Sequence, residues 1–175
     1  MIRALWQGRP VSLDQPHYPL REAQSYPLPP GGRVPLVIGG RGERRTLRIV
    51  AEHADEWNVT RVSRDEYRAR DRILAEHGRA VGRDPASIRR SLMVLIVTGT
   101  TPAEVDARRA RARALFPWVP ADAAGWHAAS LRHGVVDEVR AELAQWRAVG
   151  ISRVMLQVLD MDDLGLVRLL ARVRP

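Results

Sequence analysis

The residues with the clearest chemical potential lie between positions 35 and 60, in the sequence PLVIGGRGERRTLRIVAEHADEWNVT. Three glycines, Gly39, Gly40 and Gly42, separate a short apolar run from a helical pattern. Glycine lets backbone N–H groups approach an anion closely, and the positive end of a helix dipole favours negative charge at its N-terminus. The segment therefore predicts a phosphate-binding turn.

Polar side chains around this turn could strengthen the binding of an anion. Arg41, Arg44 and Arg45 supply guanidinium groups for charge-assisted contacts, and Thr46 offers a hydroxyl group in the first helical turn. The spacing matches neither G-x-G-x-x-G nor G-x-x-x-x-G-K-[ST], so neither a dinucleotide-binding turn nor a P-loop follows. From the residues alone, a tight turn that needs small residues for its shape is an equally good interpretation.

Other kinds of catalytic site find little support. Cysteine is absent, which excludes thiol catalysis, disulfides and cysteine metal ligands. The five histidines show no H-x-x-x-H or H-E-x-x-H spacing, so we expect no metal site. Asp55 and Glu56 are adjacent on an expected strand and would point to opposite faces, which argues against a shared catalytic role. No catalytic residue can be named from the sequence.

The net charge of +8 raises the question of nucleic-acid binding. All 28 basic residues are arginine, which, together with abundant alanine, glycine and proline, is typical of the coding bias of a high-GC genome. The densest cluster comprises Arg108, Arg109, Arg111 and Arg113 and would spread around more than one face of a helix. We therefore favour a solvated helix over a nucleic-acid-binding stripe, and a small molecule as the ligand.

The elements that must position the turn alternate along the chain. Apolar runs predict strands at 34–38, 56–60, 91–98 and 151–158. Helical periodicity and capping signals predict helices after the glycine turn, at 64–81, from residue 101, at 134–149 and at 164–173. Strands that alternate with helices require a parallel sheet with right-handed crossovers. The expected fold class is α/β, with four parallel strands and flanking helices.

Two segments interrupt this alternation. Residues 1–7 resemble the end of a helix that begins abruptly, which suggests a truncated or late start, and residues 8–35 contain seven prolines and three glycines, typical of an extended loop with room for short β pairs. Residues 117–133 are expected to form an irregular loop with a short helix. Its Trp118 and Trp126 could cover a ring-shaped ligand or, if the units form a barrel, plug the open side of that barrel. With neither a secretory signal nor a membrane-spanning run, we expect a cytoplasmic protein.

The combined motifs resemble the second half of luciferase-like monooxygenases, in particular the coenzyme F420-dependent oxidoreductase branch. The likeness covers essentially the whole chain. It rests on G-x-x-V-x-x-x-x-x-H-Y-x-L-x-E-A at 8–23, P-L-P-P at 27–30, the segment 35–58, A-V-G-R-D-P-A-S-I at 80–88 and G-V-V-D-E-V-R-A-E-L-x-x-W-R-A-V-G-I-S-R-V-M-L-Q at 134–157. One departure is Gly134-Val135-Val136, where the family usually has Gly-Thr-Pro, so a good helix-starting signal is lost.

The resemblance implies the C-terminal half of a TIM-type (β/α)8 barrel, with the cofactor at the C-terminal ends of the strands. Residues 1–175 would form one truncated luciferase-like domain, in which 1–33 are a helix end and proline-rich loop and 34–175 are β/α units five to eight. The implied cofactor is coenzyme F420, with FMN as the alternative. Its phosphate would be bound by Gly39, Gly40, Arg41, Gly42, Arg45 and Thr46. Asn58 and Thr60 would face the substrate, and Leu156 and Gln157 would line the mouth of the last strand.

The complete enzyme would transfer a hydride to, or monooxygenate, a small organic substrate. The first four β/α units, which in the family hold most of the cofactor ring and the groups that act on substrate, are absent here. We therefore expect the chain to keep the phosphate loop without the full redox chemistry. The alternative is an inactive half-barrel that acts as an interaction module, pairing with a second copy or with a complementing half-barrel.

Overall fold

The computed structural model describes residues 1–174. The chain forms two compact units, and the first ends at Leu36 and the second begins at Val37. This boundary lies close to residue 33, where the proline-rich segment was expected to end. That residues 1–175 form one domain stays a prediction, and Pro175 lies outside the described residues.

The first unit is a short, proline-rich assembly. It contains helix α1 (Ile2–Leu5), an antiparallel pair of strands β1 (Val11–Leu13) and β2 (Leu20–Ala23), and a 3-10 turn at Pro30–Gly32. The short helix and the short β pair agree with the sequence, because closely spaced prolines prevent a longer helix.

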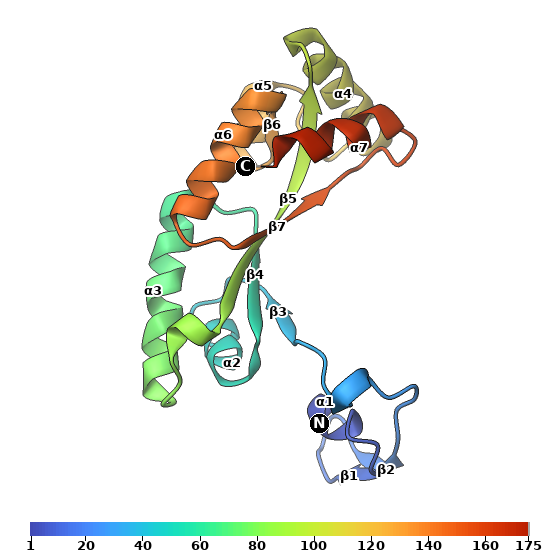
Figure 1. The fold of residues 1–175 in the computed structure, drawn as a ribbon, viewed down its shortest axis with the longest axis vertical. Helices are drawn as coiled ribbons and strands as arrows, with labels where there is room; N and C mark the ends of the chain where they lie inside the picture. The colour runs from blue at the N-terminus through green and yellow to red at the C-terminus, as the bar shows by residue number, and fades with distance from the viewer. Residues whose placement is uncertain (175) are drawn as a thin grey trace. The chain divides into compact units, whose positions relative to one another are not determined.

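The second unit is built on a parallel sheet (Figure 1). Its strands are β3 (Val37–Gly39), β4 (Glu56–Thr60), β5 (Arg89–Gly99), β6 (Arg132–Val135) and β7 (Arg153–Gln157). β5 is central: it pairs with β4 on one side and with β7 on the other. β6 pairs only with the last residues of β5, 96–99. Four of these strands confirm the sequence-based prediction. The fifth, β6, was missed, because its sequence RHGV carries no apolar run.

The helices of this unit are α2 (Thr46–His53), α3 (Arg64–Ala80), α4 (Pro102–Leu115), α5 (Ala123–Ala128), α6 (Val136–Ala148) and α7 (Leu164–Leu170), with 3-10 turns at Pro85–Ser87 and Ala171–Val173. The predicted capping box of α3 is present: Ser63 Oγ accepts from Glu66 N at 3.2 Å, and Glu66 Oε2 accepts from Ser63 N at 2.8 Å. At α6 only half of such a box forms. Glu138 Oε2 accepts from Val135 N at 2.9 Å, but the valine side chain has no oxygen to offer in return.

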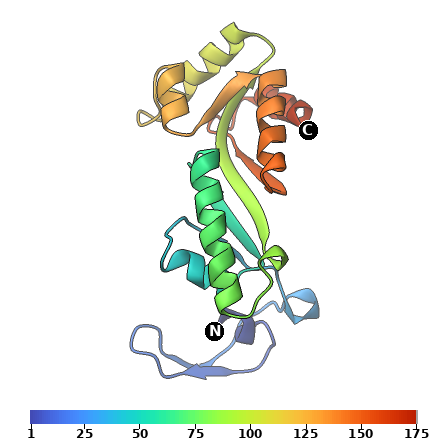
Figure 2. The same cartoon turned by 90° about the vertical axis from the view of Figure 1, so that its left-hand side faces the viewer.

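The main core lies between one face of the sheet and the helices α2, α3 and α6. Trp57 stacks on Tyr67 with ring centroids 5.8 Å apart, and Tyr67 meets Trp146 edge-on at 5.9 Å. Figure 2 shows α3 running alongside β4 and β5. Because side chains alternate along a strand, Trp57 and Val59 face these helices, and the side chain of Asn58 lies on the opposite face.

Candidate functional site

The predicted glycine turn follows directly from the C-terminal end of β3. We call residues 39–46 the glycine loop. Gly40 N donates to Asn58 O at 3.2 Å, which extends the pairing with β4 by one residue before the chain turns away. Gly40 has a φ of +123°, and a Cβ at this position would lie 2.9 Å from Thr46 Cγ2. A Cβ on Gly42 would lie 2.9 Å from Thr46 Oγ1. The packing of the loop against Thr46 therefore requires glycine at both positions.

Three carbonyl groups of the loop point inward, toward side chains of β4 and α3. Trp57 Nε1 donates to Gly40 O at 2.7 Å, and Arg70 Nε donates to Arg41 O at 3.1 Å. On α3, His77 Nε2 lies 2.9 Å from Glu43 O. The carbonyl oxygens of the loop are thus held by one core side chain and by two side chains of the neighbouring helix.

This arrangement determines where the amide groups point. In a trans peptide unit the C=O and N–H bonds are antiparallel, so the N–H groups of Arg41, Gly42 and Arg44 point away from the groups that bind the carbonyls. Among the residues that the structure describes, none of these three N–H groups has a hydrogen-bond acceptor. A run of free N–H groups beside the start of a helix is the backbone arrangement that binds anions.

The side chains around the loop add positive charge. Arg44 and Arg45 are exposed and have no acidic partner within residues 1–174. The guanidinium group of Arg41 donates to Arg61 O at 2.7 Å, which fastens the loop to the residue that follows β4. Thr46 is half-buried at the start of α2, whose N-cap residue Arg45 provides no side-chain cap. Free amides, guanidinium groups and one hydroxyl group fit a phosphate, and the single carboxylate of the loop, Glu43, is exposed to solvent.

The expected substrate-side residues lie on the sheet face away from α2 and α3. Asn58 Nδ2 donates to Ser91 Oγ at 2.9 Å and lies 3.9 Å from Met155 Sδ. Ser91 and Met155 were not recognised from the sequence. Asn58 is in register with Ser91, which shows how the two side chains come together, but register cannot be seen in the sequence alone.

Thr60 and Gln157, expected on different strands, are brought together. Both line a small pocket at the C-terminal ends of the strands, next to Met93 and Ser130. The side chain of Leu156 points to the opposite face of β7 and packs against the apolar core near α6 and α7. The structure thus separates the two residues that were expected to line the mouth of the last strand.

The two tryptophans of segment 117–133 differ in environment. Trp126 is fully buried, and its Nε1 donates to Pro120 O at 2.9 Å. Trp118 is 53% exposed, with the guanidinium carbon of Arg61 5.0 Å from its ring centroid. Trp126 is therefore a core residue, and only Trp118 remains available to cover a ligand.

The four arginines of the dense cluster on α4 all have partners within the chain. Arg108 and Arg111 pair with Asp163 and Asp160, which follow β7. Arg109 pairs with Asp106 on the same helix, and Arg113 donates to Val119 O at 2.7 Å. Three of these side chains connect α4 to neighbouring segments and the fourth is paired within the helix, so they do not form one free basic stripe.

Residues 1–174 contain neither a metal-binding cluster nor a membrane-spanning helix. No group of three or more histidine, cysteine, aspartate or glutamate side chains in this range could hold a metal ion. None of the helices in the described part of the chain is long and apolar enough to cross a membrane.

Comparisons with curated proteins found mycobacterial relatives. The phthiodiolone/phenolphthiodiolone dimycocerosates ketoreductase of Mycobacterium sp. (strain JLS) is 35% identical over 109 residues, which cover 60% of this chain and 28% of the relative. The protein of that name from Mycobacterium kansasii is 28% identical over 178 residues, which cover 99% of this chain and 45% of the relative. The chain thus spans less than half the length of these relatives.

Solved structures share the fold at low sequence identity. An F420-dependent secondary alcohol dehydrogenase in complex with an F420-acetone adduct has a TM-score of 0.72 and 19% identity, covering 99% of this chain and 59% of that one. A coenzyme F420-dependent tetrahydromethanopterin reductase from Methanopyrus kandleri has a TM-score of 0.74, 12% identity and the same coverage. The oxygenating constituent of 3,6-diketocamphane monooxygenase from Pseudomonas putida, in complex with FMN, has a TM-score of 0.68, 13% identity and coverage of 95% and 56%.

The sequence also matches the family model of the luciferase-like monooxygenases over residues 1–162. The parallel sheet and the fold of the solved structures agree with that match. The chain therefore belongs to the luciferase-like monooxygenase family.

Proposed function

We propose that this chain is the cofactor-phosphate-binding half of a luciferase-like oxidoreductase, and that its glycine loop binds the phosphate of coenzyme F420, with FMN as the alternative. The observation that carries the proposal is the orientation of the loop: the carbonyl groups of Gly40, Arg41 and Glu43 are bound by the protein, which leaves neighbouring N–H groups free. Arg45 and Thr46 would complete the phosphate contacts by charge and by a hydroxyl group.

The nature of the cofactor is supported by the relatives. Two of the structures with this fold are described as F420-dependent, and a third is in complex with FMN. Either cofactor, when bound, would supply the redox centre that exchanges a hydride with a small organic substrate, or that activates oxygen in the case of a flavin. The chain's own contribution would be to bind and orient the phosphate end.

The substrate would lie on the sheet face that bears Asn58 and Thr60. Gln157 shares a pocket with Thr60, and Trp118 is exposed near Arg61, so polar and aromatic groups meet at this end of the strands. A location in the cytoplasm belongs to the same proposal and rests on the sequence features described above.

The test compares ligands with and without the phosphate, which in F420 is part of a longer acidic tail. The purified chain is titrated calorimetrically with FMN and with riboflavin, and with F420 and its phosphate-free deazaflavin core. We expect the phosphate-bearing member of one pair to bind at least about tenfold more tightly, and Arg45→Gln to remove most of that difference. Arg72→Gln, an exposed arginine on α3, is the matched control. Equal affinities within both pairs, or no binding at millimolar concentration, would contradict the proposal.

A second candidate function is pairing of half-barrels. Within the described residues, no strand pairs with the outer edge of β3, and Val37 on this strand is 43% exposed. An open edge of a parallel sheet is a place where another chain can add a strand. Light scattering after size exclusion should then show an assembly larger than a monomer, and Val37→Lys should shift it toward the monomer. A monomer at all concentrations would exclude pairing with a second copy.

A further inference from the structure

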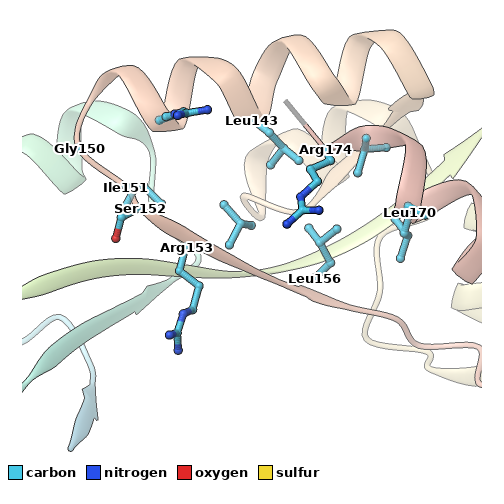
Figure 3. Close-up of a pocket in the computed structure, with 12 residues that line it drawn as sticks. Leu143, Gly150, Ile151, Ser152, Arg153, Leu156, Leu170 and Arg174 are labelled. Carbon is cyan, nitrogen blue, oxygen red and sulfur yellow. The ribbon is translucent and has the colours of Figure 1, made fainter. Parts of the chain in front are cut away.

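A cavity of about 880 Å³ lies beside β7, on the face of the sheet that the helices cover (Figure 3). We call it the α6–β7 cavity. Its walls come from the end of α6, from the chain between α6 and β7, from β7 itself and from the C-terminal 3-10 turn. The volume falls within the range of roughly 300–1,000 Å³ that is usual for small-molecule sites. It is separate from the glycine loop, because β4 and β5 stand between β7 and β3 in the sheet.

Most of the cavity wall is aliphatic. Leu143 of α6, Leu156 of β7 and Leu170 of α7 approach the same space from three elements, as Figure 3 shows. Ile151 and Val173 are 3% and 1% exposed, so the floor belongs to the packed interior rather than to a mobile surface. Such walls suit the hydrocarbon part of a ligand.

All the charged side chains of the wall are positive. Arg147, Arg153 and Arg174 line the cavity, and none of its twelve lining residues is acidic. Arg153 NH1 lies 3.3 Å from Glu56 Oε2 and is thereby paired. Arg147 and Arg174 have no acidic partner in the described part of the chain. Figure 3 shows Arg174 extending between Leu143 and Leu156.

Two unpaired guanidinium groups beside an aliphatic wall are complementary to one class of ligand. We propose that the α6–β7 cavity binds an amphipathic organic anion, whose carboxylate or phosphate group contacts Arg147 and Arg174 and whose hydrocarbon body packs against Leu143, Leu156 and Leu170. Guanidinium groups bind carboxylate and phosphate oxygens with charge-assisted hydrogen bonds, and the hydrocarbon body gains from leaving water. The inference concerns a second site and does not depend on the function of the glycine loop.

The test uses defined probes on the full chain. Decanoate and decyl phosphate represent the two anionic headgroups, and decanol has the same hydrocarbon body without charge. Binding is measured by displacement of the fluorescent anion 1-anilinonaphthalene-8-sulfonate and, directly, by calorimetry. The substituted protein is Arg147→Gln/Arg174→Gln, with Arg72→Gln as the control. Because both cavity arginines are exposed at the surface, the substitutions should leave the thermal unfolding temperature unchanged.

We expect saturable binding of one decanoate or one decyl phosphate per chain, at least about tenfold weaker binding of decanol, and a loss of about tenfold or more in anion affinity in the double variant. The ratio of the decanoate and decyl phosphate affinities identifies the preferred headgroup. A second variant, Leu156→Ala, should weaken the binding of all three ligands by a similar factor.

The proposal is overturned if no probe binds saturably, if decanol binds as tightly as the anions, or if the double variant binds the anions as tightly as the wild type does. It is also overturned if light scattering shows a dimer that dissociates on Leu156→Arg substitution, since a second copy would then fill the cavity.

Discussion

Trp57 and Gly40 are joined by a hydrogen bond of 2.7 Å from the indole Nε1 to the glycine carbonyl oxygen. The tryptophan is fully buried and its ring stacks on Tyr67, so the donor is held in place by the core of the sheet. The bond fixes the direction of the Gly40–Arg41 peptide unit, and with it the direction of the Arg41 N–H group. The core of the second unit and the candidate phosphate site are therefore mechanically connected.

Trp57→Phe should destabilise the protein and weaken phosphate binding together. The substitution removes the donor, leaves the Gly40 carbonyl without its partner and shrinks a fully buried ring, for which we expect a loss of about 2–4 kcal/mol in the free energy of unfolding. Urea unfolding followed by circular dichroism measures the loss. Trp118→Phe, at a 53% exposed tryptophan, should change the stability by less than about 0.5 kcal/mol. Equal stabilities of the two variants would contradict this role of the bond.

Gly42→Ala should disturb the loop through a single contact. Its new Cβ would lie 2.9 Å from Thr46 Oγ1, and the φ of Gly42 is not in the left-handed region, so the clash is the main source of strain. We expect a destabilisation of about 1–3 kcal/mol. In Gly42→Ala/Thr46→Ala the nearest remaining atom, Thr46 Cβ, lies at an ordinary 3.6 Å, so most of the stability should return. A double variant as unstable as the single one would show that the contact with Thr46 Oγ1 is not what destabilises Gly42→Ala.

Arg108→Met should loosen the contact between α4 and α7. Arg108 Nε donates to Asp163 Oδ2 at 2.7 Å, and its NH1 donates to Thr98 O at 2.9 Å. The paired side chains are 18% and 20% exposed, so the substitution leaves a poorly solvated carboxylate without its cation. We expect a loss of about 1–3 kcal/mol in the free energy of unfolding, measured with urea. Arg72→Met at an exposed position of α3 should have little effect, and a similar loss in both variants would refute the argument.

The stability should decline below about pH 6.5 because of His133. Burial, and then the nearby charge of Arg109, lower the pKa of the His133 imidazole below its ordinary value of 6.5. The folded state therefore prefers the neutral ring, whose contribution is complete above pH 6.5 and is lost as the pH falls through that value toward the lower pKa of the folded state. Unfolding with urea at pH 7.5 and 5.0 measures this decline.

The histidine can be separated from other acid-sensitive groups by substitution. His133→Gln should show a smaller loss of stability between pH 7.5 and 5.0 than the wild type, whereas His127→Gln, at an exposed position, should lose as much as the wild type. The carboxyl groups of Asp160 and Asp163 also have lowered pKa values, but they titrate below this range because their ordinary value is 3.8. An unchanged pH dependence in His133→Gln would exclude the imidazole as the cause.

The sequence by itself determined the local elements and the place of the glycine turn. Periods of apolar residues gave the strands β3, β4, β5 and β7, and Ser63 with Glu66 gave the start of α3, because these signals depend on neighbours within a few positions. The strand β6 was missed for the same reason: its own residues form no apolar run, and the strand is stabilised by pairing with residues 96–99 of β5, which are distant in sequence.

Only the tertiary structure decided what surrounds the glycine loop and where the second cavity lies. Trp57, Arg70 and His77 bind the loop carbonyls from 17 to 34 positions away, and Asn58 meets Met155 across 97 positions. The α6–β7 cavity likewise joins Leu143 to Arg174. The direction of a peptide unit and the pairing of a charge depend on such distant contacts, and these are set by strand register and helix packing, which no local pattern of residues contains.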